Sequence, residues 1–245
     1  MRRNFLLCCF TVMFLSGCGT TLRTSPNYYQ NVTQIKTLAV MPVDVEVFSL
    51  TAGNVRELRD DWSEKAKNDV DTALEKVLNG KYAWKIKFVD KDWIKANAYT
   101  TWRQNKALYE AVALSATLHG FNSQGQYSQS FKTKKDKFDY TLGSEIASLA
   151  KSVDADALLF VYGYDHEATA GRVASFWFNL MVGAVTGVTI VPTNPSLMTM
   201  GLINGETGDL EWYKTTPPAS EYSFRNSKEI EKVMQWLGKD LYPVK

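Results

Sequence analysis

The chain has 245 residues, of which 45% are hydrophobic and 13% aromatic, a composition typical of a folded globular protein rather than a disordered one. Its 28 basic and 26 acidic residues give a net charge of +2, too small a basic excess to predict nucleic acid binding. With Cys 3 and His 2, the chain offers few ligands for a metal site and few nucleophilic thiols.

Residues 1–17 predict a signal peptide. Met1–Asn4 is a short positive opening, and Phe5–Leu15 is an apolar run too short to span a bilayer. The run closes in Leu15-Ser16-Gly17-Cys18, which resembles the lipobox of bacterial lipoproteins. The resemblance implies that the Cys18 thiol receives a diacylglycerol group, that the signal is removed and that the new amino terminus is acylated. The alternative is an ordinary secretory protein that is cleaved and soluble.

Lipidation at Cys18 would attach the protein to membrane lipid almost permanently, because several acyl chains bury far more apolar surface than one. Gly19 stands where an aspartate would favour the inner membrane in bacteria resembling the enteric ones, which implies an outer-membrane anchor and a domain facing the periplasm. Signal removal also takes away the other two cysteines and both Arg2 and Arg3, leaving 26 basic and 26 acidic residues. No thiol then remains for a disulfide, a metal or a nucleophile, and no cofactor is expected.

The mature chain divides into a short leader and one domain. We expect residues 18–34 to form the lipidated amino terminus and a polar tether, because Gly19–Gln34 is rich in polar residues and has no apolar period. At about 3.5 Å per extended residue the tether reaches at most roughly 56 Å, so the domain should work near its own membrane. Residues 35–245 are expected to form a single globular domain.

Strand and helix patterns alternate along this domain. Ile35–Val43 is a dense apolar stretch that predicts a buried first strand, and a helical period runs from Asn54 to Leu78. Trp84–Asp90 alternates apolar and charged residues, which predicts a strand with one solvent-facing side. Later elements are expected in this order: a helix from its capping residue Asp92 toward Leu118, a solvated loop over Asn122–Lys137, a helix over Leu142–Val153, strands over Ala155–Tyr164, Leu197–Ile203 and Leu210–Tyr213, and a helix over Ser227–Leu241 capped by Ser227. This order predicts an α/β or α+β fold, a mixed β-sheet flanked by helices.

Four features resemble the CsgG/LpoB-like periplasmic lipoproteins. They are the lipobox cysteine, the strand Leu38–Val43, the helix leading into Ala155–Leu159, and the turn within Asn204–Trp212, where Thr207-Gly208 and Trp212 match a "TG" turn and a following tryptophan-bearing strand. The resemblance implies a sheet flanked by helices, in the manner of the anticodon-binding and TolB amino-terminal folds. It also implies a role as a partner or scaffold rather than an enzyme, although fold alone does not settle function.

An apolar insert over about residues 168–196 departs from a simple hairpin, which needs only a handful of connecting residues. Val173–Val191 within it carries no charge. One interpretation is a segment packed on the domain's own core. The other is a contact with a membrane or a neighbouring subunit through Phe176, Trp177 and Phe178.

Two glycines of the insert, Gly183 and Gly187, have the spacing that lets two helices approach closely. The family that the chain resembles carries a membrane-spanning hairpin at this position. A pore of that kind needs a second hairpin, and Lys214–Arg225 is too short and too proline-broken to supply it. A secretion pore is therefore not the expected role, and contact with a membrane, with a neighbouring subunit or with the domain's own core stays open.

Few groups suggest catalysis. Asp165-His166-Glu167 looks like a catalytic cluster, but neighbours on a strand face opposite sides, so a solvent-exposed strand end is the simpler interpretation. His119 is far away in the sequence, and no nucleophile elbow, phosphate loop or dinucleotide fingerprint is present. The basic cluster Lys132–Lys137 predicts a solvated loop, with contact to an anionic polymer or lipid headgroups as the alternative.

The sequence thus predicts a non-enzymatic outer-membrane lipoprotein that acts as an envelope assembly or secretion-associated scaffold. It would form a homo-oligomer or bind an envelope protein complex, with Cys18 in membrane lipid and with no nucleic acid partner. The alternative is an accessory activator of a cell-wall or transport enzyme. A hydrolase using Asp165 or His166 is a third class, and no other feature of the sequence supports it.

Overall fold

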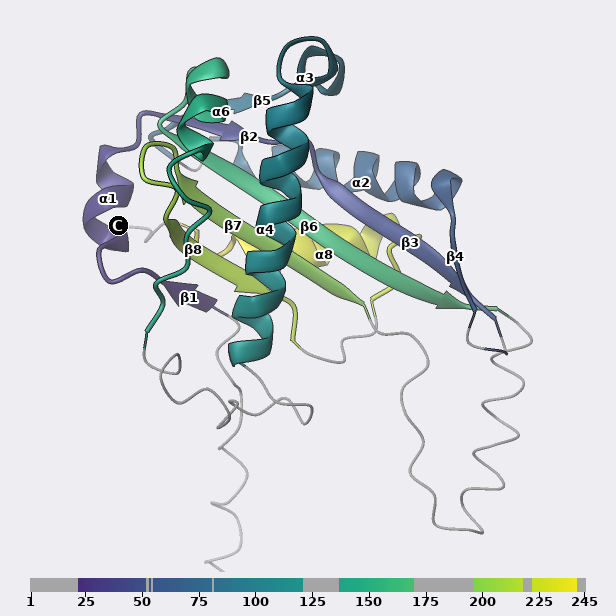
Figure 1. Ribbon diagram of the computed structural model, residues 1–245. Coiled ribbons are helices and arrows are strands. Elements are labelled where there is room, and N and C mark those ends of the chain that lie inside the picture. Colours follow the sequence, from purple (N-terminus) through teal and green to yellow (C-terminus); the bar gives the residue numbers. More distant parts are fainter. Residues whose placement is uncertain are drawn as a thin grey trace, which may run out of the picture.

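The computed structural model shows helices packed on both faces of one mixed β-sheet (Figure 1). It describes residues 22–51, 53, 55–80, 82–120, 137–169, 196–217 and 222–241. The described strands are β1 Leu22–Thr24, β2 Thr37–Val40, β3 Asp44–Leu50, β4 Arg56–Leu58, β5 Lys85–Phe88, β6 Ala157–Ala168, β7 Leu197–Asn204 and β8 Leu210–Thr215. The described helices are α1 Tyr28–Asn31, the 3-10 turn η1 Val32–Gln34, α2 Asp60–Leu78, α3 Lys91–Asn97, α4 Tyr99–Gly120, α6 Ile146–Ser152 and α8 Ser227–Gly238. This confirms the predicted α+β class.

The long strand β6 organises the sheet. The main strand order is β1-β8-β7-β6-β2-β5, and β3 also pairs with β6. On one side of β6, two strands pair with it in parallel: β2 pairs with the first residues of β6, and β3 pairs with its last residues. Two successive strands of the chain thus share β6 as their neighbour. On the other side, β7 and then β8 continue the sheet antiparallel. The strands β1 and β5 therefore form opposite edges of the main path.

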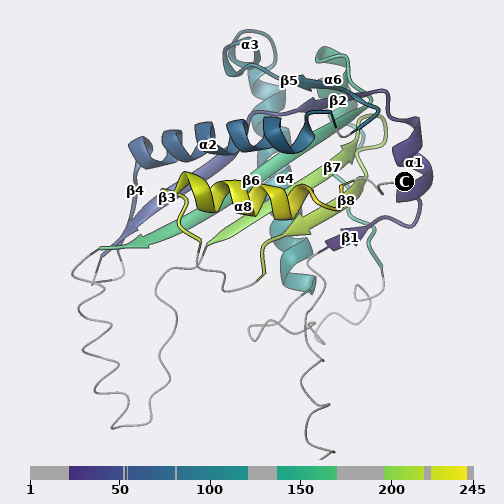
Figure 2. The ribbon, with the colours of Figure 1, turned by 180° about the vertical axis from the view of Figure 1, so that it is seen from behind.

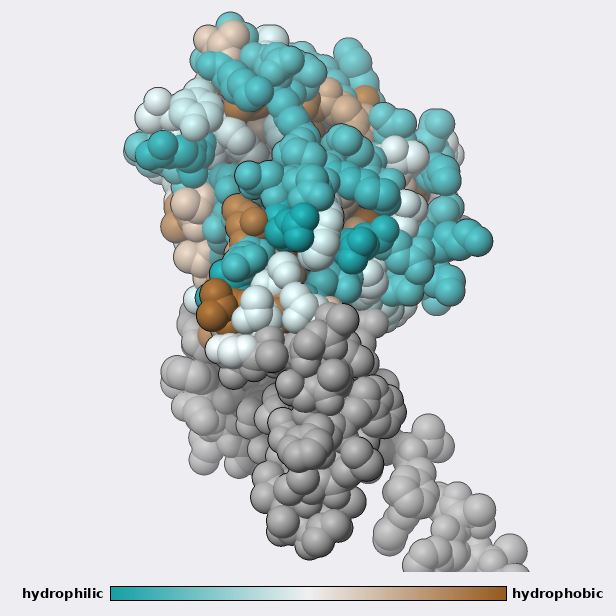
Figure 3. All heavy atoms as spheres, turned by 90° about the vertical axis from the view of Figure 1, so that its right-hand side faces the viewer, coloured by the Kyte–Doolittle hydropathy of each residue, from teal (hydrophilic) through white to brown (hydrophobic). Residues whose placement is uncertain are grey.

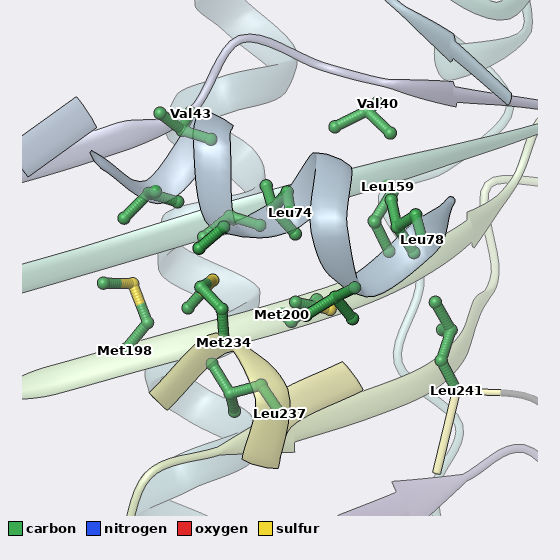
Figure 4. Close-up of a cluster of buried hydrophobic side chains, with 14 of the residues drawn as sticks. Val40, Val43, Leu74, Leu78, Leu159, Met198, Met200, Met234, Leu237 and Leu241 are labelled. Carbon is green, nitrogen blue, oxygen red and sulfur yellow. The ribbon is translucent and has the colours of Figure 1, made fainter. Parts of the chain in front are cut away.

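The helices α2 and α8 cover one face of the sheet, and α3, α4 and α6 lie on the other (Figures 1 and 2). Beneath α2 and α8 the side chains of both helices meet those of the central strands (Figure 4). The inward residues predicted for the last helix are all buried: Ile230, Val233, Met234 and Leu237.

The second core lies between α4 and the sheet. The rings of Tyr109 and Trp102 on α4 stack on Phe160 of β6, with centroids 5.0 and 5.6 Å apart. Gly201 on β7 makes room for this contact, because a Cβ atom there would lie 2.6 Å from the Tyr109 ring. The close approach of helix and sheet thus depends on a residue without a side chain.

The turn between β7 and β8 matches the sequence prediction. The Asn204 side-chain oxygen accepts hydrogen bonds from the backbone N–H groups of Glu206 and Thr207 at 2.9 and 3.1 Å. Gly208 has a φ of 78°, in the left-handed region that favours glycine. A Cβ atom there would also lie 2.1 Å from the carbonyl oxygen of Gly143, so the turn requires glycine twice over.

Several predicted boundaries are wrong. The helix expected from Asn54 begins at Asp60, because the hairpin of β3 and β4 occupies the preceding residues. Val55 and Leu58 fit the helical period by chance and are 56% and 48% exposed. The helix expected from Asp92 toward Leu118 is divided into α3 and α4.

Two predicted helix caps lie one or two residues from the true ones. Asp90 caps α3: its side chain accepts hydrogen bonds from the N–H groups of Asp92 and Trp93. Asn226 caps α8 by accepting from the N–H of Lys228. Each prediction chose a residue that already has helical geometry, whereas a capping residue must stand outside the helix.

Candidate interaction edge

Strand β5 pairs with β2 on one side and with no other described strand. The Lys85 N–H donates to the Lys36 carbonyl at 2.8 Å, and the Val89 N–H donates to the Val40 carbonyl at 2.9 Å. Backbone groups of successive strand residues point to alternate sides, so those of Ile86 and Phe88 point away from β2. The outer side of β5 is therefore a template to which another strand can pair.

Two grooves flank this strand, one on each face of the sheet. The groove on the α2 side has a volume of about 380 Å³ and is lined by Glu75, Leu78, Asn79, Gly80, Tyr82, Trp84, Ile86 and Phe88. The groove on the α3 and α6 side has a volume of about 400 Å³ and is lined by Lys87, Phe88, Val89, Asp90, Trp93, Ser152, Val153 and Asp154. Phe88 lines both.

Large apolar side chains remain accessible along this edge. Phe88 is 41% exposed and Trp93 is 37% exposed. The Asp90 cap fixes the first turn of α3 and thereby holds Trp93 beside the groove. Tyr82 stacks on Trp84 at a centroid distance of 5.1 Å and forms an aromatic wall on the α2 side. Clusters of exposed apolar residues of this kind mark interaction sites. By contrast, the side of the domain shown in Figure 3 is mostly hydrophilic, with small separate hydrophobic patches.

The charges at the edge are unevenly distributed. The Lys87 ammonium donates to the Val153 carbonyl at 3.3 Å, to the Asp154 carbonyl at 2.8 Å and to the Asp154 carboxylate at 2.7 Å. The hydrogen bond from Lys87 lowers the pKa of Asp154 below its ordinary value. Lys36 and Lys85, which are neighbours through their backbones, are exposed, and neither forms an ion pair within the part of the chain that the structure describes.

The opposite edge of the sheet holds the beginning of the domain. Leu22 of β1 pairs with Lys214 of β8, and the backbone N–H of Ser25 donates to the Glu211 carbonyl at 2.8 Å. The Glu211 carboxylate, in a residue only 3% exposed, accepts from the Asn31 amide at 2.6 Å and from the Ser25 hydroxyl. The prediction of a free tether is therefore wrong for residues 22–34.

This correction brings the domain closer to the predicted anchor. Tyr28 and Val32 of the expected tether are both 1% exposed and belong to the core beneath α2 and α8. Between Cys18 and Leu22 an extended chain spans only about 14 Å. Across the sheet, β1 and β5 are five strand spacings apart, roughly 24 Å at about 4.8 Å each. Strand β5, which the two grooves flank, thus lies at the edge of the sheet opposite the one where the described chain begins (Figure 1).

The residues predicted to contact membrane or partner lie outside the described residues. These are Cys18, Phe176, Trp177, Phe178, Gly183 and Gly187, together with the basic residues 132–136. Their assignments remain predictions.

The suspected catalytic cluster is divided between the two faces of β6. Asp165 is 1% exposed, and its carboxylate accepts from the Phe224 N–H at 2.8 Å, while Glu167 accepts from the Ser223 hydroxyl. On the other face the His166 ring stacks on Phe48, at a centroid distance of 5.3 Å. The alternation was predicted correctly, but the solvent-exposed strand end was not, because the segment before α8 covers Asp165.

Burial raises the pKa of Asp165 to about 7, and the nearby Glu167 carboxylate adds to the shift. A second titratable cluster joins α4 to β3, where the Lys106 ammonium lies 2.8 Å from the Asp44 carboxylate and 3.2 Å from that of Glu110. Burial raises the pKa of Glu110 to about 7. Both clusters tie one element to another, and neither lines the two grooves described above.

Other kinds of site are not formed by the described residues. Among them no group of three or more His, Cys, Asp or Glu side chains is arranged to hold a metal ion. None of the described helices has both the length and the apolar composition needed to cross a membrane.

No protein-family model and no curated protein matches the sequence. Among solved structures, the chain is similar to PelC from Paraburkholderia phytofirmans, solved as a dodecamer, with 10% identity, a TM-score of 0.32 and coverage of 89% of this chain and 94% of PelC. It is also similar to the LpoB C-terminal domain from Salmonella enterica, with 13% identity, a TM-score of 0.26 and coverage of 79% and 93%. Likenesses of this degree carry no function across.

The sequence prediction did not identify β5 as an interaction edge, although the sequence contains one indication of it. The pattern over Trp84–Asp90 predicted a strand, but which strand ends a sheet depends on the spatial order of all strands. The aromatic residues Tyr82, Trp84, Phe88 and Trp93 cluster around one short strand, and that density in a segment with a solvent-facing side is the usable indication.

Proposed function

We propose that this protein is a non-enzymatic lipoprotein of the outer membrane that binds an envelope protein complex through the free edge of β5. Lipid on Cys18 would hold the domain at the membrane by its β1 edge. The β5 edge would then be available to a partner. The protein would act as a scaffold that keeps this partner close to the membrane.

One observation carries this proposal: the outward backbone groups of β5 pair with no other described strand and lie between two grooves, at the sheet edge opposite the start of the domain. A short strand, aromatic side chains and grooves on both faces are features of a binding surface. The polar clusters around Asp165 and Glu110, in contrast, join elements of the domain to each other. The residues of the edge thus suit recognition rather than bond-breaking chemistry.

The alternative role as an accessory activator places different demands on the chain. An activator whose enzyme lies across the periplasm needs a long tether, whereas residues 22–34 are packed on the domain. The remaining reach of about 14 Å favours a partner at the same membrane. An enzyme complex that comes to this membrane would satisfy both descriptions.

The test compares two substitutions of equally exposed residues in the full-length lipoprotein. Phe88 on β5 and Leu108 on α4 are both 41% exposed. Each is replaced by Ser, and the size of the native complex is measured after mild detergent extraction. We expect Phe88→Ser to release the protein from its complex and Leu108→Ser to leave the complex intact. Equal behaviour of the two variants would refute the proposal.

A further inference from the structure

We infer that the β5 edge binds an extended peptide segment of its partner as an added β-strand, and that Lys36 and Lys85 select a segment with an acidic residue beside its apolar core. This inference rests on the proposed function of the edge and specifies what kind of segment occupies it. Four observations support it, namely the backbone groups, the grooves, the position of the lysines and the charge of a self-paired edge.

The outward backbone groups of β5 suit a strand. Ile86 and Phe88 each present one N–H and one C=O away from β2, so an added strand can form up to about four hydrogen bonds with them. A helix cannot satisfy these groups, because its own N–H and C=O groups are bonded internally. An extended segment is therefore the form of peptide that the edge recognises.

The grooves specify the side chains of that segment. Successive residues of a strand point to opposite faces, so one set enters the groove beside Trp84 and the other enters the groove beside Trp93. Both grooves, of about 380 and 400 Å³, fall at the lower end of the range for ligand sites, about 300 to 1,000 Å³. The segment should consequently carry consecutive apolar residues, as a strand covered on both faces does.

Edge lysines usually protect a sheet against pairing, but at this edge the protection is incomplete. The Lys87 ammonium, in the middle of β5, is held by Val153 and Asp154 and so is drawn away from the outer side. The exposed ammonium groups are those of Lys36 and Lys85, both at the amino end of the strand. A partner with an acidic residue at this end would gain attraction there, and a basic residue would meet repulsion.

A second copy of the chain is a poorer occupant than an acidic segment. Two β5 strands paired antiparallel about a twofold axis would place Ile86 opposite Phe88 of the other copy. In the same register Lys85 would lie opposite Val89 of the other copy, which carries no charge. An acidic residue in a different chain offers the Lys85 ammonium an attraction that a second copy lacks. Complementary charge therefore favours a different chain.

The experiment measures peptide binding to the full-length lipoprotein in nanodiscs of phosphatidylcholine, by fluorescence anisotropy. The probe is a fluorescein-labelled hexapeptide, Glu-Val-Phe-Val-Phe-Glu, and the comparison peptide has Lys in place of both Glu residues. We expect the acidic peptide to bind at least tenfold more tightly than the basic one. Lys85→Glu should abolish this preference, and Lys228→Glu, a charge reversal on the exposed side of α8, should preserve it.

A separate variant tests whether the peptide binds as an added β-strand. Ile86→Pro removes an outward N–H while leaving the hydrogen bonds between β5 and β2 in place, and proline is tolerated on edge strands with this orientation. We expect Ile86→Pro to weaken binding of the acidic peptide at least tenfold and Ile86→Val to leave it unchanged, with both variants melting near the temperature of the native protein. If Ile86→Pro melts much lower, the same test is made with an acidic peptide that is N-methylated on all four apolar residues. This blocks both of its edges, so the peptide should not bind the native protein.

Three results would overturn the inference. They are equal binding of the acidic and basic peptides, full binding of the N-methylated peptide, and a concentration-dependent dimer that Ile86→Pro abolishes. The proposed function fails separately, when Phe88→Ser and Leu108→Ser leave the native complex equally intact. If Phe88→Ser breaks the native complex but the acidic peptide does not bind, the added-strand mode alone is rejected.

Discussion

The ammonium group of Lys87 lies 2.7 Å from the carboxylate of Asp154, although the two residues belong to a strand and to a turn 67 positions apart. Asp154 has a φ of 48°, in the left-handed region, and this brings its carbonyl toward the same lysine. The pair removes a positive charge from the middle of the β5 edge, where an incoming strand would lie. A turn after α6 thereby controls the charge of the interaction edge.

Weakening this pair should change the selectivity of the edge. Asp154→Asn tolerates the left-handed backbone but lacks the negative charge, so the Lys87 ammonium gains freedom to reach the outer side of β5. We expect tighter binding of the acidic hexapeptide and weaker binding of the basic one, measured by anisotropy as above. Asp92→Asn, at another exposed carboxylate close to the edge, serves as the control and should alter neither affinity.

Removing the Glu211 carboxylate should release the start of the domain. In Glu211→Ala the Ser25 hydroxyl and the Asn31 amide lose their shared acceptor. Hydrogen bonds to charged groups contribute about 1.5–3 kcal/mol, so the free energy of unfolding should fall by about that amount. Hydrogen exchange measures the local effect, and we expect faster exchange in residues 22–34 while β6 and β7 keep their protection. Slow exchange throughout 22–34 would contradict the assignment.

Stability should depend on pH through Asp165. Because its pKa is raised from 3.8 to about 7 in the folded protein, folding favours the protonated form, and the free energy of unfolding should decrease as pH rises from about 4 to about 7. Asp165→Asn keeps an oxygen for the Phe224 N–H and carries no charge. Its melting temperature should exceed that of the native protein at pH 8, and the difference should shrink toward pH 4. A constant difference would show that Asp165 is not the group responsible.

The apolar insert remains a separate prediction. If Phe176, Trp177 and Phe178 contact lipid or a neighbouring subunit, deletion of residues 171–192 should reduce oligomer size in light scattering or ease extraction from the membrane. Substitutions at Phe88 should not mimic the change in extraction. Unchanged assembly and extraction after the deletion would favour packing on the domain's own core.

Elements buried on both faces were the most predictable from the sequence. The dense apolar runs that became β2, β6 and β7 have few alternatives to a central strand, and the glycine of the turn after β7 is required by its backbone. Strand β3 was missed, since the residues after Pro42 alternate buried and half-buried positions in a pattern easily overlooked. Tyr28 and Val32 lie in the polar segment before Ile35, and their burial was not predictable because it depends on tertiary contacts with distant residues.

The candidate site was less predictable than the fold. Short-range patterns predict that Lys85–Phe88 forms a strand, but its position at the end of the sheet follows from the order β6-β2-β5, which joins residues far apart in the chain. The same holds for Asp165, which the segment around Phe224 buries from 59 positions away.

Photocrosslinking in intact cells tests the central claim most directly. A benzophenone amino acid is placed at position 88 or 108 of the full-length lipoprotein, in backgrounds with and without Ile86→Pro. A β5 edge that binds an envelope partner predicts one strong crosslinked product from position 88, its loss with Ile86→Pro, and no such product from position 108. The absence of a product at position 88, or the same product at both positions, would contradict it.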